Sequence, residues 1–288
     1  MEATVETITA MCYQENNGYH AVQFLRHNAL PTVSLDVDED CRKKMVVWSY
    51  QVVDFCKFTR ESVEIAMSYF DRYLLTPSGI RALEDRTVFQ LAAMASLYTA
   101  VKIHEPEAMD PKLVSALSRG AYLPQDIEQM EFSILQALQW RVNPPTALSF
   151  AREFLKLIPA EAMSEATRII AYDVTKFQTE LAVSESDFVS LKPSVVAYCS
   201  FMNALESLEL DPKVIQYVGI IIQEAVGITD SRSDQIQDVQ SYLYTAVVRQ
   251  HLGKLTDFTN QPDSPKPESH HSLVTVSPHS SILLLDHL

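Results

Sequence analysis

Three charged residues lie at helical positions where the local spacing predicts apolar side chains. Asp71, Lys102 and Glu131 each follow an apolar residue by four positions, so each falls on the apolar stripe of its segment. A partly buried charge needs a partner, because desolvation costs several kcal/mol per ion. Arg42 can pair with Asp71 between neighbouring helices, and Lys102 and Glu131 can pair with each other or with a ligand. On spacing alone, the simpler alternative is that such charges lean out to solvent, as Lys102 can do near a helix end.

No enzyme motif accompanies these charges. The sequence contains no GxGxxG, GxxxxGK, HExxH or GxSxG pattern. Single histidines such as His104 have no nucleophile or acid partner nearby in sequence, which favours a surface role. The cysteines are scattered without a CxxC pair, at Cys12, Cys41, Cys56 and Cys199. This argues against a zinc site or a disulfide framework and for a reducing compartment. We therefore expect a protein with no catalytic residues, no cofactor and no metal.

Composition narrows the function further. Only 6 of 288 residues are Gly, whereas phosphate and dinucleotide loops need the positive φ angles that Gly supplies. The net charge of −14 disfavours binding to DNA and to anionic membranes. The first residues are acidic, so no signal peptide is expected. The most apolar stretches, 195–205 and 214–228, fall short of the ~20 residues that a membrane span needs.

The helical pattern divides at Asn143-Pro144-Pro145. Five helical segments are expected on each side of this break, and we predict an all-α protein of two tandem five-helix domains. The expected segments are about 41–55, 63–74, 84–102, a short one from 110, 124–140, 146–157, 161–182, 193–207, 212–226 and 232–252.

Segments of different composition flank these domains. The predicted boundaries are an N-terminal segment over 1–36, a first domain over 37–143, a second over 144–253 and a tail over 254–288. The N-terminal segment is expected to hold a short helix over Gly18–His27. The tail is rich in Ser, Pro and His, which predicts disorder. Ser264 and Ser277 each precede a Pro and are candidates for proline-directed phosphorylation.

The unusual charges fall within longer motifs. Residues 41–48 place an Arg and a Trp six positions apart, and residues 66–74 end in Asp-Arg-Tyr-Leu. With residues 91–94, 100–103, 129–131 and 138–140, these segments resemble the cyclin box. The five positions that best define that box are all present at family spacing: Arg42, Asp71, Leu91, Lys102 and Glu131. The resemblance covers about residues 38–145, whereas residues 146–252 resemble a second cyclin fold only by helix pattern and a Pro-Pro-Thr entry.

This resemblance implies a regulatory subunit that binds and activates a cyclin-dependent protein kinase as a heterodimer. By resemblance, Lys102 and Glu131 bind backbone groups of the kinase, and Ile103 and Ile134 pack around them. Arg42 and Asp71, together with Leu91 and Trp48, are implied to be structural. The Arg-Lys-Lys opening looks most like D-type cyclins, which implies control of cell-cycle progression at G1/S.

The resemblance also gives Met45, Trp48 and Gln51 as a candidate docking patch for kinase substrates. Lys44 replaces an apolar residue of that patch, and Gln51 replaces the Glu that would pair with a substrate Arg. Both departures count against docking of Arg-x-Leu substrates. The Leu-x-Cys-x-Glu motif of many D-type cyclins is not present.

Other helical proteins share this fold without activating a kinase. A transcription factor of this fold binds DNA and is usually basic, so a charge of −14 argues against it. A cyclin-fold adaptor scaffold stays the main alternative. The expected partners are the kinase, and as further candidates its substrates and inhibitors, with no nucleic acid and no membrane. We expect the protein in the nucleus, the cytoplasm or both.

Overall fold

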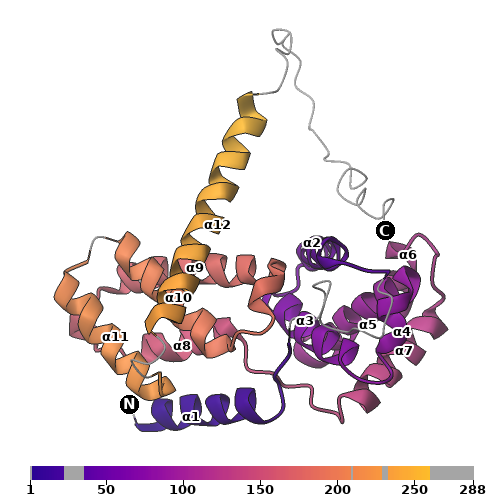
Figure 1. Ribbon diagram of the computed structural model, residues 1–288, viewed down its shortest axis with the longest axis horizontal. Coiled ribbons are helices and arrows are strands. Elements are labelled where there is room, and N and C mark those ends of the chain that lie inside the picture. The colour runs from indigo at the N-terminus through magenta and orange to yellow at the C-terminus, as the bar shows by residue number, and fades with distance from the viewer. Residues whose placement is uncertain (1, 23–35, 209, 229–232, 260–288) are drawn as a thin grey trace.

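The computed structural model describes residues 2–22, 36–208, 210–228 and 233–259, with Ser233 and 249–259 described by backbone alone. All regular structure within these ranges is helical (Figure 1). None of these helices is long and apolar enough to cross a membrane.

The first fold is built around one helix that is buried on all sides. That helix is α5 (Arg86–His104), in which every residue from Ala92 to Val101 is buried. A helix that is apolar all round has to lie at the centre of a core, and α5 contacts all five other helices of this fold. They are α2 (Glu39–Cys56), α3 (Glu61–Leu74), α4 (Ile80–Glu84), α6 (Pro111–Leu117) and α7 (Pro124–Ala137).

Short polar residues determine where several of these helices begin. The side chain of Asp38 accepts a hydrogen bond from the Cys41 amide at the start of α2. Asp85 does the same for α5 and Asp110 for α6, where Pro111 takes the first helical position. Each carboxylate accepts a hydrogen bond from an amide that has no partner inside the helix. Its negative charge is also stabilised by the positive end of the helix dipole.

The second fold repeats this plan around α10 (Pro193–Ser207). Every residue from Ser194 to Leu205 is buried, and α10 contacts all four other long helices of this fold. They are α8 (Ala147–Leu157), α9 (Glu165–Ser184), α11 (Pro212–Val226) and α12 (Ser233–Thr259), with 3-10 turns at Ala160–Ala162 and Ser186–Phe188. The prediction of an all-α protein with two tandem folds is therefore confirmed.

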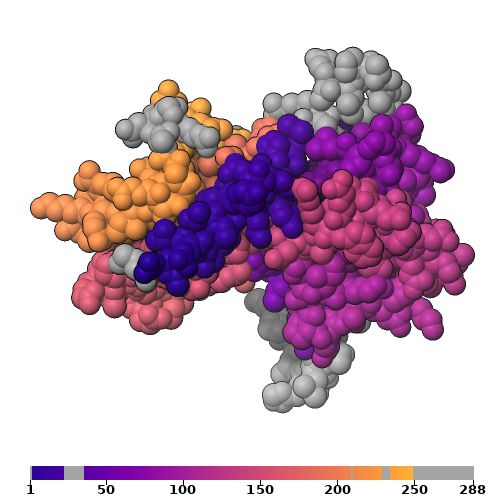
Figure 2. Space-filling model, turned by 90° about the horizontal axis from the view of Figure 1, so that it is seen from below, coloured from indigo at the N-terminus to yellow at the C-terminus, as the bar shows by residue number. Residues whose placement is uncertain are grey.

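The N-terminal segment differs from its prediction. Helix α1 (Glu2–Asn17) was not predicted, because only Ile8 and Glu15 of it are buried and so thin a stripe gives little pattern. The helix packs on α8 and α11 and runs along the surface of the second fold toward the junction (Figure 2). The predicted helix over Gly18–His27 is not formed over residues 18–22, and its remainder lies outside the described residues. Helix α4 is a further short helix that the pattern did not indicate.

The C-terminal boundary is also later than expected. Helix α12 continues through Gly253 to Thr259, so residues 254–259 belong to a helix and not to the predicted tail. A Gly inside a helix costs only about 1 kcal/mol relative to Ala, which is not enough to end it. The rest of the tail, with Ser264 and Ser277, lies outside the described residues.

Candidate functional site

Lys102 and Glu131 face each other across α5 and α7. The Lys102 Nζ atom lies 3.1 Å from Glu131 Oε1 and 3.0 Å from Oε2. The lysine side chain is 48% exposed, whereas that of Glu131 is only 10% exposed. Lys102 Nζ also lies 5.4 Å from the ring centre of Tyr98. The hydrogen bond to Glu131 raises the pKa of Lys102 above its usual value.

Large apolar side chains are exposed on the elements that carry this pair. Ile103 is 43% exposed beside Lys102 in the chain, and Phe132 is 54% exposed beside Glu131. Ile134, which was expected to share the partner-facing surface, has no exposed area. It lies in the core of the first fold, so that part of the prediction is wrong. The sequence spacing placed Ile134 on the apolar face of its helix. It could not show that other elements of the first fold bury this face completely.

Trp140 is an exposed residue that the sequence did not select as a site residue. Its side chain is 61% exposed directly after α7. Gln139 and Trp140 have φ angles of 53° and 60°, in the left-handed region that residues other than Gly seldom adopt. At this helix end the Trp140 amide donates to the Leu135 carbonyl oxygen over 2.9 Å. The helix was predicted over 124–140 but ends at Ala137, so the sequence pattern gave no sign that Trp140 lies outside the helix.

The two residues after Ile103 face inward. His104 Nε2 lies 2.9 Å from the carbonyl oxygen of Val142 and 2.9 Å from the Tyr69 hydroxyl. The Tyr69 hydroxyl in turn donates to the same Val142 carbonyl oxygen, so the three groups form one polar cluster. Glu105 Oε1 accepts hydrogen bonds from the Thr59 amide, the Thr59 hydroxyl and the Ser62 hydroxyl. The last turn of α5 thus presents Lys102 and Ile103 outward while the next two residues anchor it.

Arg42 and Asp71 form a buried pair between α2 and α3. Arg42 donates from Nε to Asp71 Oδ1 over 2.9 Å and from Nη2 to Oδ2 over 2.8 Å. The two side chains are 4% and 6% exposed. The third bond of Arg42, from Nη1 to the Val183 carbonyl oxygen over 2.8 Å, reaches the end of α9 in the second fold. Arg42 therefore also joins the two folds, which the sequence had not indicated.

The candidate docking patch is mostly buried. Met45 has no exposed area, Trp48 is 3% exposed, and Gln51 is half-buried. Met45 and Trp48 belong to the core of the first fold, so they offer no surface to a substrate and this prediction is wrong for both. Trp48 is therefore structural, and its Nε1 atom has no hydrogen-bond partner among the described residues. Leu91 packs against the same core.

Family models of known proteins match the residues of both folds. The model of the cyclin N-terminal domain matches residues 9–143, and the model of the cyclin C-terminal domain matches residues 145–276. The chain belongs to the cyclin family. Cyclins are regulatory subunits of kinases and not enzymes themselves.

The similar cyclins are of A and B type. The chain is 29% identical to a G2/mitotic-specific cyclin-A of Spisula solidissima, over 62% of this chain and 39% of that one. It is 26% identical to Cyclin-B2-1 of Arabidopsis thaliana, over 61% of this chain and 38% of that one. The chain spans less than half the length of the curated relatives it matches. These relatives do not bear out the D-type resemblance, which stays a prediction.

A solved cyclin has the same fold. The crystal structure of a viral cyclin from herpesvirus saimiri superposes with a TM-score of 0.66. It covers 83% of this chain and 97% of its own, at 14% sequence identity. At that identity the likeness supports the fold and says nothing of the partner.

Proposed function

We propose that this cyclin binds a cyclin-dependent protein kinase through Lys102 and Glu131 and holds it in its active conformation. The observation that carries the proposal is the pair itself: a half-exposed ammonium and a nearly buried carboxylate beside the exposed Ile103. Because the ammonium of Lys102 is half-exposed and screened by water, the pair contributes little to stability, about 1 kcal/mol. Its groups are therefore available for stronger, charge-assisted bonds to a partner's backbone.

The proposed mechanism is a population shift. A protein kinase is active only when its β3 Lys pairs with the Glu of its αC helix and the activation loop is ordered. A cyclin that binds this conformation more tightly than the inactive one raises its population in proportion to the difference in affinity. Control of G1/S progression is part of the proposal and rests on the Arg-Lys-Lys opening of α2.

The test compares Lys102→Ala and Glu131→Ala with Lys112→Ala, a change at an exposed lysine of α6. Each of the first two should weaken kinase binding by about 2–5 kcal/mol, roughly 30- to 4,000-fold, because a hydrogen-bonded charge contact loses one partner. In the free protein, Lys102→Ala should lower the melting temperature more than Glu131→Ala. The first change leaves a nearly buried carboxylate unpaired, whereas the second leaves a lysine that water can solvate.

The measurements are affinity for the kinase that co-purifies from cell extract, the activity of that kinase, and the melting temperature of each free variant. Normal affinity with lowered melting temperatures would mean that the pair serves only the fold. Binding without a gain in kinase activity would instead favour the adaptor scaffold.

A further inference from the structure

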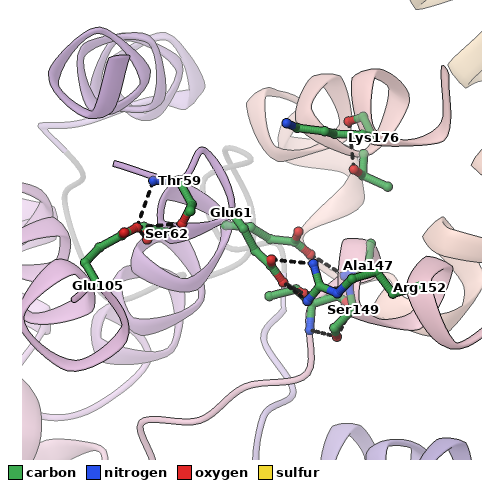
Figure 3. Close-up of polar contacts among 11 residues, drawn as sticks. Thr59, Glu61, Ser62, Glu105, Ala147, Ser149, Arg152 and Lys176 are labelled. Atoms are coloured by element: carbon green, nitrogen blue, oxygen red, sulfur yellow. Dashed lines mark hydrogen bonds and ion pairs between the residues drawn. The ribbon is translucent and has the colours of Figure 1, made fainter. Parts of the chain in front are cut away.

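Hydrogen bonds connect the end of α5, next to the Lys102–Glu131 site, to the start of α3. The start of α3 is in turn bonded to the second fold. We call residues 59–64, which include the first turn of that helix, the α3 entry. Glu105 lies directly behind the exposed turn of α5 and bonds to the α3 entry at three points. The distances to Glu105 Oε1 are 2.9 Å from the Thr59 amide, 2.5 Å from the Thr59 hydroxyl and 2.5 Å from the Ser62 hydroxyl (Figure 3).

The α3 entry also holds the start of α8. Glu61 accepts two hydrogen bonds from Arg152, over 2.7 and 2.9 Å, and one from the Thr146 hydroxyl (Figure 3). Glu64 accepts a hydrogen bond from the Ala147 amide, at the first helical position of α8. Glu61 and Ser62 are neighbours in the chain. The first turn of α3 therefore carries both a hydrogen bond to Glu105, directly after α5, and the hydrogen bonds to the start of α8.

A second connection runs beside the first. His104 Nε2 lies 2.9 Å from the carbonyl oxygen of Val142, which immediately precedes the linker at residues 143–146 that leads into α8. A cleft of about 440 Å³ lies between the two connections, lined in part by Ser62, His104 and Arg152.

We propose that the second cyclin fold controls kinase binding by setting the position of the last turn of α5 through the α3 entry. Arg152 and Glu105 are the two ends of the connection and act as positioning residues, since neither belongs to the Lys102–Glu131 site. The effect on affinity rests on the proposed function, whereas the effect on α5 itself does not.

The first experiment needs no kinase. Hydrogen exchange of the backbone amides is measured in the full chain for Arg152→Ala, Arg152→Lys and Lys156→Ala. Lys156 is the matched control, because it lies one turn further along α8 and its ion pair with Glu153 stays within that helix. Arg152→Ala should speed exchange at residues 103–105, where the Glu105 amide donates to the Val101 carbonyl oxygen. Arg152→Lys keeps the charge but loses the two-pronged bond, and should show a smaller change.

The second experiment measures affinity for the kinase in a double-mutant cycle of Arg152→Ala and Glu105→Gln. Each change should weaken binding by about two- to thirtyfold, the size that side-chain networks usually transmit. The double variant should lose less than the product of the two, because both act through one connection. Glu107→Gln, at an exposed acid two residues beyond Glu105, should bind like the parent.

The outcomes separate the two proposals. Unchanged exchange at residues 103–105 in both Arg152 variants overturns the connection, even if their melting temperatures fall. Control of binding by the second fold is overturned if amide exchange at residues 103–105 is faster but affinity for the kinase is unchanged. It is also overturned if the affinity loss of the double variant equals the product of the two single losses. If Lys102→Ala also binds normally, the proposed function fails, and the exchange result still decides whether the connection exists.

Discussion

At the residue scale, the contacts of Arg42 give the clearest expectation for stability. Asp71→Ala removes both carboxylate bonds and leaves a guanidinium that is 4% exposed without its counter-charge. We expect a loss of about 3–5 kcal/mol in the free energy of unfolding. The measurement is denaturant unfolding of the free chain.

The control for this change is Asp40→Ala, at an acid of α2 whose side chain is 68% exposed. It should alter stability by no more than about 0.5 kcal/mol. Replacing both members of the buried pair by apolar residues, as in Arg42→Met with Asp71→Leu, should cost less than Asp71→Ala alone, because no charge is left buried. A parent-like unfolding curve for Asp71→Ala would show that the pair does not stabilise the fold.

At the scale of elements, the contact between α3 and α8 should depend on acid pH. Burial alone would raise the pKa of Glu61, but the hydrogen bonds from Arg152 and Thr146 outweigh it and hold that pKa below its usual value. A carboxyl whose pKa is lower in the folded state stabilises that state above its unfolded pKa, and the gain is lost as pH falls through the folded value. Glu61→Gln should therefore lower the melting temperature at pH 7.

The same variant should melt progressively closer to the parent as pH falls below the usual carboxyl range, because folded Glu61 takes up its proton only below that range. The check is a series of melting curves of both proteins from pH 7 down to pH 3. A gap in melting temperature that stays constant over that range would mean that ionisation of Glu61 contributes nothing.

At the scale of the whole molecule, several charged side chains join the two folds. Arg60 donates to Glu180 on α9 over 2.8 Å and to Asp54 on α2 over 2.6 Å, and its guanidinium lies 4.3 Å from the ring centre of Tyr50. Lys43 pairs with Glu185, also at the end of α9. An interface of this kind weakens when salt screens its charges.

Arg60→Ala should cost about 1–2 kcal/mol and make the two folds unfold in separate steps, because a charged contact between them is lost. Calorimetry at low and high salt is the measurement, and Lys156→Ala is the matched control. Lys156 pairs with Glu153 inside α8, so its loss should leave a single transition. A single sharp transition for Arg60→Ala at both salt concentrations would contradict the prediction.

The sequence by itself determined where most of the helices lie. Their apolar residues recur every three to four positions, and prolines and acids mark their starts at Asp110-Pro111 and after Asp38. The same spacing identified Asp71, Lys102 and Glu131 as charges on apolar stripes, with Arg42 as a possible partner of Asp71. Periodicity is local, so it places a side chain on one face of its own helix without any knowledge of the other helices.

Only the tertiary structure decided what covers each face. Ile103 and Ile134 had the same expected role, yet the first is 43% exposed and the second is in the core. Met45 and Trp48 were expected at a surface and are buried, and α1 was missed because so little of it is buried. The reach of Arg42 to Val183 joins residues 141 positions apart. Burial and pairing depend on which other elements pack against a face, and that is settled only when distant parts of the chain meet.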